Sequence, residues 1–204
     1  MADPTRPPTR VLVLRHGQSE WNAARRWQGH ADIALDDEGV RQASTAASSL
    51  GMFDAVWASD LQRARHTAEI IAERIGIGPV QTDERLRETD VGPWEGLTHR
   101  EVEAGWPGYL ATHRRPDGFE PYPQAARRMA LALADIAQEQ PGGSEILVVS
   151  HGGAIRALRR ELGAEDEHFP NLAGSWFTVL GDGRVHAGEI VATLARARAA
   201  DEVL

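Results

Sequence analysis

The sequence predicts an α/β fold, in which helices cover both faces of a mostly parallel central sheet in three layers. Two observations carry this prediction. Short continuous apolar runs, such as Val11–Leu14 and Glu145–Ser150, are typical of strands buried on both faces. Segments with helical periodicity alternate with these runs. A chain of 204 residues with this pattern fits one domain with a sizeable core, which we place at residues 11–194.

Strand and helix patterns alternate along the first half of the chain, and a glycine follows each helix pattern as a stop signal. In chain order, the expected elements are a strand at 11–14, a helix at 37–50, a strand at 55–58, a helix at 61–75 and a strand that begins near Val80.

The second half contains a segment without clear periodicity, at residues 92–124, which is rich in Gly, Pro and aromatic residues. Because long loops on a scaffold commonly carry specificity, we assign residues 97–124 as a lid or specificity insertion. The elements expected after it are a helix at 123–140, a strand at 145–150, a helix at 154–162 and a hairpin of 176–180 with 188–192.

The two ends of the chain lack a core pattern. We expect a disordered tail at residues 1–10 and a polar tail at residues 195–204. No apolar run precedes the first strand, and no apolar stretch approaches the roughly 18 residues that a membrane helix needs. We therefore expect no signal peptide, no membrane partner and a cytoplasmic location.

Composition excludes several kinds of chemistry. The chain has no cysteine, which rules out disulfides, thiolate metal ligands and a cysteine nucleophile. All 22 basic residues are arginine, so a phosphate site must rely on arginine, histidine and backbone N–H groups. The net charge of −8 argues against nucleic acid as a partner, whereas a local cluster of arginines can still attract a small anion. No histidine spacing is typical of a metal site, and we expect no metal and no cofactor.

Histidine and glycine follow two of the expected strands. Arg15-His16-Gly17 follows the first strand, and His151-Gly152-Gly153 follows the strand that ends at Ser150. Arg63 lies shortly after a third strand. Ligands of open α/β sheets bind beyond the carboxyl ends of the strands, so these residues are candidates for one anion site. Taken alone, either histidine is equally compatible with a structural role.

Five blocks of sequence extend this pattern, in order, over residues 11–156. They are Leu14-Arg-His-Gly-Gln-Ser-Glu-Trp-Asn22; Gln28-Gly29 with Asp32, Leu35, Gly39, Gln42 and Ala43; Ser59-Asp-Leu-Gln-Arg-Ala-Arg-His-Thr-Ala68; Leu86-Arg-Glu-Thr-Asp-Val-Gly-Pro-Trp-Glu-Gly96; and Val148-Val-Ser-His-Gly-Gly153. Together they resemble the motifs of the histidine phosphatase (phosphoglycerate-mutase-like) superfamily. The resemblance implies a phosphoglycerate-mutase-like fold.

The resemblance also implies roles for individual residues. His16 would attack phosphorus and become a phosphohistidine, and Arg15, Arg63 and His151 would contact the phosphoryl oxygens. Glu88 would give a proton to the leaving group. The residues assigned to substrate binding are Asn22, Gln28 and Gly152.

The implied function is that of a metal-independent phosphomonoester hydrolase acting on a small phosphorylated metabolite. The block Thr89–Gly96 looks like the phosphatase branch of the family; a phosphoglycerate mutase and a non-catalytic phosphate-binding or protein-interaction module are the alternatives. Residues 86–98 and Gly174-Ser-Trp176 are similar to the family's glucosyl-3-phosphoglycerate phosphatases, while a broad-specificity phosphomonoesterase remains equally open. Many phosphatases of the family have a Gly-Glu-Ser pattern near this point. Glu120 matches the acid of that pattern, but the serine is missing from this sequence. A homodimer stays open, because no hydrophobic stripe identifies an interface.

Overall fold

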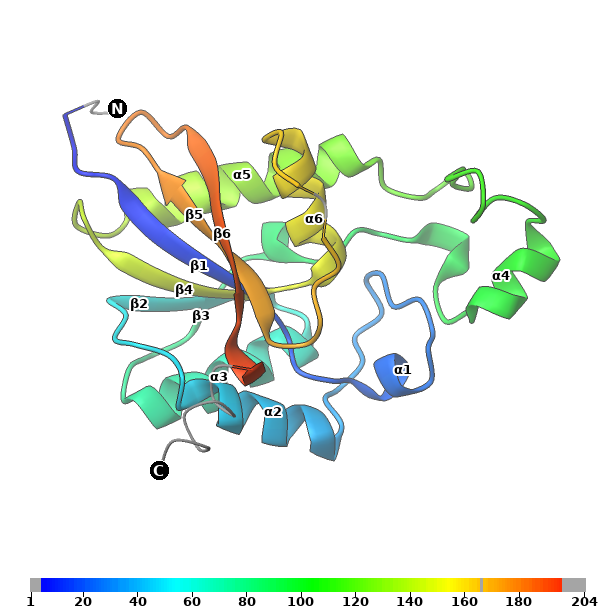
Figure 1. The fold of residues 1–204 in the computed structure, drawn as a ribbon, viewed down its shortest axis with the longest axis horizontal. Coiled ribbons are helices and arrows are strands. Elements are labelled where there is room, and N and C mark those ends of the chain that lie inside the picture. The colour runs from blue at the N-terminus through cyan, green and yellow to red at the C-terminus, as the bar shows by residue number, and fades with distance from the viewer. Residues whose placement is uncertain (1–4, 166, 196–204) are drawn as a thin grey trace.

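The computed structural model describes residues 5–165 and 167–195, and among them it places a six-stranded sheet between two layers of helices (Figure 1). The strand order is β3-β2-β4-β1-β5-β6. The first four strands of this order are mutually parallel, β5 is antiparallel to β1, and β6 is antiparallel to β5. The strands are β1 (Thr9–Arg15), β2 (Ala55–Ala58), β3 (Gln81–Thr82), β4 (Glu145–Ser150), β5 (Ala173–Val179) and β6 (Val185–Ala192). The predicted three-layer α/β/α fold with a mostly parallel sheet is confirmed.

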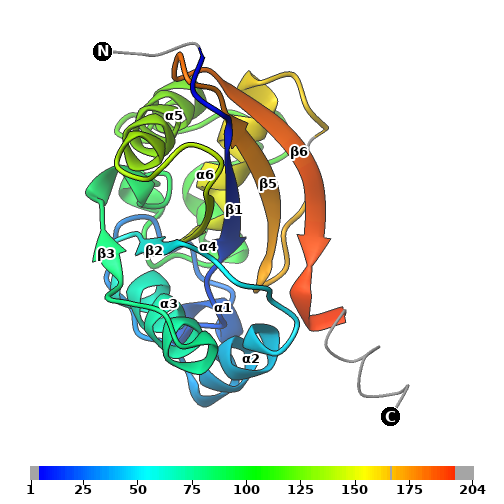
Figure 2. The same ribbon diagram turned by 90° about the vertical axis from the view of Figure 1, so that its left-hand side faces the viewer.

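Two pairs of long helices cover the sheet, one pair on each face (Figure 2). Helices α5 (Tyr122–Gln138) and α6 (Gly152–Glu161) lie on one face, and α2 (Asp37–Ala47) and α3 (Gln62–Ile75) lie on the other. The short helices are α1 (Glu20–Ala23), α4 (His99–Gly105) and the 3-10 turns Glu84–Leu86 and Gly92–Trp94. In Figure 1, α1 and α4 lie beyond the edge of the sheet at which β1 ends.

The continuous apolar run of β1 serves both layers. Val11 and Val13 belong to the core beneath α5 and α6, whereas Leu12 and Leu14 belong to the core beneath α2 and α3. Successive strand residues point to opposite faces, so a strand between two helix layers needs apolar residues at every position. Burial of each such side chain contributes about 1.5–3 kcal/mol.

A third cluster, separate from the two cores of the sheet, organises the lid segment. Its buried members are Val91, Trp94, Val102 and Phe119. Helix α4 lies in this segment and was not predicted, because it buries only Val102 and so lacks an apolar stripe. Its start does follow a sequence rule: Thr98 and Glu101 form a capping box.

The N-terminal tail is shorter than predicted. Thr9 and Arg10 belong to β1, and Arg6 donates hydrogen bonds to the carbonyl of Ala137 (2.6 Å) and to Oε1 of Gln138 (3.0 Å). Residues 1–4 of the expected tail and residues 196–204 of the polar C-terminal tail lie outside the described residues. Within the described ranges, no helix combines the length and the apolar character needed to cross a membrane.

Candidate active site

Strand register brings the two motif histidines together. Arg15 pairs with Ser150 in the parallel β1–β4 ladder, and the N–H of His16 donates to the carbonyl of Ser150 at 3.0 Å. The rings of His16 and His151 consequently lie with centroids 5.1 Å apart, at 63° to one another. Their exposed fractions are 2% and 0%. The adjacency predicted from two strand ends is present in the structure.

His16 is oriented by its own backbone neighbour. Its Nδ1 lies 2.6 Å from the carbonyl oxygen of Gly17, which can only accept, so Nδ1 carries the proton and Nε2 presents a lone pair. Burial, and then the charges of Arg63 and Arg15, hold the pKa of His16 well below its usual value, against a smaller opposite effect of the Gly17 carbonyl. The ring is therefore neutral near pH 7, as a nitrogen nucleophile must be.

Two guanidinium groups flank this imidazole. Arg63, on the first turn of α3, is fully buried and donates to the carbonyls of Ala31 (2.6 Å) and Gly29 (2.9 Å). Burial lowers the pKa of Arg63 to about 10, which leaves it cationic at neutral pH. Arg15 donates one N–H to the carbonyl of Phe169 at 2.7 Å, and its pKa is also lowered, chiefly by burial and against the nearby charge of Glu88. Forked donors of this kind suit phosphoryl oxygens.

His151 stands at the N-cap of α6 and faces the same region. Both of its ring nitrogens are buried, and neither has a hydrogen-bond partner among the described residues. Burial, followed by the charges of Arg63 and the other neighbours, holds the pKa of His151 well below its usual value. Buried polar atoms in proteins almost always have a partner, so this ring is suited to donate to an oxygen of a bound ligand.

The side chain of Glu88 packs against the N-terminus of helix α6 from another part of the chain. Its carboxylate accepts hydrogen bonds from the backbone N–H groups of Gly153 (3.0 Å), Ala154 (2.8 Å) and Thr89 (2.8 Å). The carboxylate thus sits at the positive end of the helix that His151 begins. Because Gly153 and Ala154 come shortly after His151 in the chain, these hydrogen bonds place Glu88 at the same edge of the sheet.

The three residues assigned to substrate binding lie around this site. Oδ1 of Asn22 accepts from the backbone N–H of Ser19 at 3.2 Å, which leaves the amide N–H donors of Asn22 for other partners. Gln28 is buried, and its Oε1 accepts from the hydroxyl of Ser19 at 2.9 Å. Gly152 lies against the arginine: a Cβ there would be 3.2 Å from Cδ of Arg15.

Two residues that support His16 were missed. Asn171 donates to the backbone carbonyl of His16 at 2.9 Å. Thr67 accepts from the N–H of Gly17 at 3.0 Å and donates to the carbonyl of Arg63 at 2.7 Å. Asn171 follows a proline and carries only a turn signal, so nothing in the sequence places it beside His16. Thr67 lies within the motif block that runs from Ser59 to Ala68, so its hydroxyl could have been considered there as a hydrogen-bonding group.

A third missed residue, Arg128, holds the segment that carries Glu88. From α5 it donates to both oxygens of Glu120, each at 2.8 Å, and to the carbonyls of Arg85 (2.8 Å), Arg87 (2.7 Å) and Glu88 (2.8 Å). Burial raises the pKa of Glu120, but the hydrogen bond and charge of Arg128 outweigh it and lower that pKa overall. Glu120, which the sequence matched to the acid of a family pattern, therefore balances the positive charge of Arg128.

Comparison with known proteins agrees with this geometry. The family model described as the histidine phosphatase superfamily (branch 1) matches residues 11–184. A glucosyl-3-phosphoglycerate phosphatase from Mycolicibacterium vanbaalenii is 38% identical over 193 residues, covering 86% of this chain and 85% of the relative. A probable phosphoglycerate mutase from Klebsiella pneumoniae is 42% identical over 158 residues, covering 72% of each chain.

A solved structure shares the architecture closely. It is that of a mycobacterial glucosyl-3-phosphoglycerate phosphatase in complex with VO3, with a TM-score of 0.79 and 30% identity, covering 90% of this chain and 97% of the other. The phosphoglycerate-mutase-like fold implied by the five motif blocks is confirmed. This chain belongs to the histidine phosphatase superfamily, branch 1.

Proposed function

We propose that the chain is a phosphatase that hydrolyses phosphate monoesters of small metabolites through a phosphohistidine formed on His16. The observation that carries the proposal is the buried imidazole of His16, whose Nδ1 is held by the carbonyl of Gly17 and whose ring lies 5.1 Å from that of His151. The charges of Arg63 and Arg15 act on this ring and, together with burial, lower its pKa. Relatives named as a phosphatase and as a mutase share most of the chain, and both kinds of reaction act on small phosphate esters.

In the first step, the lone pair of Nε2 of His16 attacks phosphorus as the bond to the ester oxygen breaks. Negative charge spread over the phosphoryl oxygens is balanced by Arg15 and Arg63, with further hydrogen bonds from His151 and Asn22. The departing oxygen takes a proton from the carboxyl of Glu88 and leaves as an alcohol.

In the second step, water attacks the phosphohistidine and the phosphorus–nitrogen bond breaks. The carboxylate of Glu88 accepts a proton from that water, which returns it to the acid form. Inorganic phosphate departs and His16 regains its neutral state. The steps use only histidine, arginine, asparagine and carboxyl groups of the chain, so we propose that turnover needs no metal or cofactor.

A phosphoglycerate mutase would share the first step and differ in the fate of the phosphohistidine. It must return the phosphoryl group to a second hydroxyl of the substrate instead of to water. Because the relative from Klebsiella pneumoniae is named a probable phosphoglycerate mutase, the experiment must also test for this reaction. A non-catalytic module would bind phosphate without forming a covalent intermediate.

The cytoplasmic location expected from the sequence remains a prediction.

The test measures phosphate release from a panel of esters in the presence of EDTA. The panel contains an aryl phosphate, 3-phosphoglycerate, glucosyl-3-phosphoglycerate, phosphoserine and sugar phosphates. In parallel, rapid quenching with a radiolabelled substrate should trap a protein-bound phosphoryl group that is stable in alkali and labile in acid. His16→Ala should lose the label and nearly all turnover, by about 10³-fold or more, and keep its circular dichroism spectrum.

Each alternative outcome points elsewhere. Undiminished turnover in His16→Ala would end the assignment of the nucleophile. Isomerised 3-phosphoglycerate without phosphate release would favour the mutase. Phosphate binding with neither label nor turnover would favour the non-catalytic module.

A further inference from the structure

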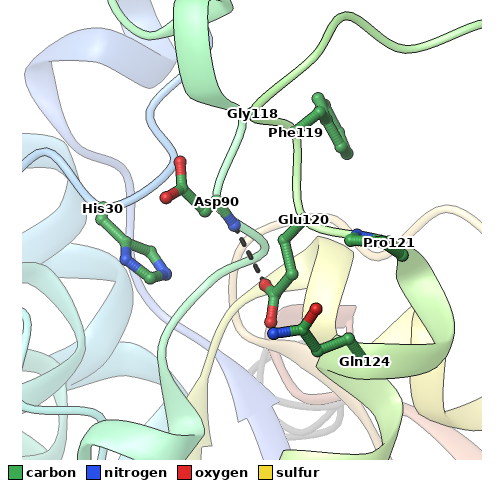
Figure 3. Close-up of a pocket in the computed structure, with 7 residues that line it drawn as sticks. All are labelled: His30, Asp90, Gly118, Phe119, Glu120, Pro121 and Gln124. Atoms are coloured by element: carbon green, nitrogen blue, oxygen red, sulfur yellow. Dashed lines mark hydrogen bonds between the residues drawn. The ribbon is translucent and has the colours of Figure 1, made fainter.

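A pocket of about 330 Å³ opens beside the proposed site, between the loop that carries His30 and the lid (Figure 3). The described residues that line it are His30, Asp90, Gly118, Phe119, Glu120, Pro121 and Gln124. Its volume lies within the range for small-molecule pockets, which leaves room for the alcohol portion of a small phosphate ester.

The pocket adjoins both the phosphate-binding arginine and the proton donor. His30 stands between Gly29 and Ala31, whose carbonyls hold the guanidinium of Arg63. Its Nε2 lies 2.8 Å from the backbone carbonyl of Glu88. A phosphate group bound at Arg63 would therefore have its alcohol portion beside this pocket.

The two acidic side chains that line the pocket, Asp90 and Glu120, present hydrogen-bond acceptors. His30 donates from Nε2 to the carbonyl of Glu88, and Gln124 adds an amide to the lining. The carboxylate of Asp90 accepts one hydrogen bond, from the N–H of Gly92 at 2.8 Å through Oδ1. In Figure 3 this carboxylate points away from Glu120, on the side of His30.

Three arginines near the pocket direct their hydrogen bonds to groups outside its lining or to Glu120. All five N–H donors of Arg128 are used, on Glu120 and on three backbone carbonyls. In the lid, Arg114 donates to the hydroxyl of Tyr109 at 3.2 Å, and Arg115 donates to the hydroxyl of Tyr122 at 3.0 Å and 3.2 Å. None of these three arginines lines the pocket. A substrate carboxylate placed here would face the carboxylate of Asp90, and no arginine of the described lining would offset that charge.

We infer that this pocket binds the alcohol portion of the substrate and selects for hydroxyl or ammonium groups over a carboxylate. The inference rests on the proposed phosphatase function and deepens it. Donor groups on the substrate would pair with the carboxylate of Asp90. A carboxylate would meet like charge, which opposes binding strongly at a partly buried site.

The test compares two substrates that differ in one group. Glycerol 3-phosphate carries a CH₂OH where 3-phosphoglycerate carries a carboxylate. We expect kcat/KM for glycerol 3-phosphate to exceed that for 3-phosphoglycerate by about tenfold or more. Asp90→Asn removes the charge and retains an oxygen that can accept from Gly92, so it should reduce the preference about tenfold, mainly by raising activity on 3-phosphoglycerate.

Two further variants control this result. Asp117→Asn makes the same change of charge at an exposed lid position outside the pocket and should leave the preference unchanged. Gln124→Glu adds a carboxylate to the lining and should increase the preference, which keeps the test informative if Asp90→Asn folds poorly. An aryl phosphate, which bears neither group, should be hydrolysed by Asp117→Asn at the rate of the unchanged protein.

The outcomes separate the inference from the function beneath it. Hydrolysis of the aryl phosphate with a preference for 3-phosphoglycerate would overturn the inference and leave the phosphatase standing. A preference unmoved by both Asp90→Asn and Gln124→Glu would do the same. Failure to hydrolyse any ester would overturn the proposed function and the inference with it.

Discussion

The carboxylate of Glu88 accepts a hydrogen bond from the backbone N–H of Gly153 at 3.0 Å, so the proposed proton donor is held by the helix that begins at His151. The motif His151-Gly152-Gly153 thus positions two functional groups at once. Its histidine lies beside His16, in the proposed phosphate site, and its second glycine holds the proposed acid. This relationship makes the role of Glu88 testable from both sides of the contact.

Substitution of the acid itself gives the first prediction. Glu88→Gln retains the size and an acceptor oxygen but has no acidic proton to give. Turnover of alkyl phosphates should fall about 10²–10⁴-fold, whereas an aryl phosphate, whose leaving group needs little protonation, should lose much less. The measurement is kcat/KM across esters of graded leaving-group acidity. Equal losses along the series would remove the proton-donor role.

Substitution of the glycine gives the second prediction. A Cβ at residue 153 would lie 2.5 Å from Oε1 of Glu88, which is too close for both atoms to keep their places. Gly153→Ala should therefore displace the carboxylate and lower turnover of alkyl phosphates by roughly 10–100-fold, with a smaller effect on aryl phosphates. Gly105→Ala, where a Cβ meets nothing within 4 Å, is the matched control. Full activity of Gly153→Ala would show that the contact is dispensable.

The third prediction concerns Arg128, which positions the Glu88 segment. Its pair with Glu120 is largely buried, with side-chain exposures of 19% and 9%. Arg128→Met leaves the carboxylate of Glu120 buried without its cationic partner and should lower the free energy of unfolding by about 3 kcal/mol, measured by urea denaturation. It also removes the donors that hold the carbonyls of Arg85, Arg87 and Glu88, so hydrolysis of alkyl phosphates should fall.

A double variant separates these two effects. Combining Arg128→Met with Glu120→Leu removes the unpaired charge and should recover much of the stability. The loss on alkyl phosphates should persist, because the three carbonyls still lack their donor. Recovery of activity together with stability would reduce Arg128 to a purely structural role.

The fourth prediction follows from the two buried histidines. Burial lowers the pKa of His16 and of His151 well below the value of 6.5 expected in the unfolded chain. Below pH 6.5 the unfolded chain therefore binds protons that the folded chain excludes, and stability decreases as the pH falls. Above pH 6.5 this contribution to stability is complete. The slope between pH 6.5 and 5.5 should approach about 1.4 kcal/mol per pH unit for each histidine.

Urea denaturation at several pH values checks this slope. His16→Asn and His151→Asn should each flatten it, since each removes one group that must stay neutral to remain buried. A slope that is unchanged in both variants would contradict the assignment of the effect to these histidines.

The sequence predicted most of the sheet, because its strands are the chain's clearest continuous apolar runs. The strands at 55–58 and 145–150 were predicted with their observed bounds. The motif histidines were also placed correctly, since parallel strands bring their carboxyl ends to one edge. Helix α4 was missed because a capping box without an apolar stripe is a weak signal. The predicted first strand begins two residues later than β1 because Thr9 and Arg10 are polar.

The support around the site was harder to predict, for a different reason. Asn171 acts on a backbone carbonyl 155 residues away in the chain, and Arg128 on three carbonyls at least 40 residues away. Backbone carbonyls are the same at every position, so a contact of this kind leaves no pattern in the partner's sequence. Only the fold shows which residues such donors reach.

The separate aromatic cluster of the lid has a consequence for how far the pocket and the histidine site depend on each other. Phe119, which lines the pocket, packs within that cluster at 5.7 Å from the ring of Trp94, whereas His16 and Arg63 are anchored to the sheet and to α3. A substitution in this cluster could therefore reshape the pocket that we propose selects the metabolite, while the residues that we propose break the ester bond keep their places.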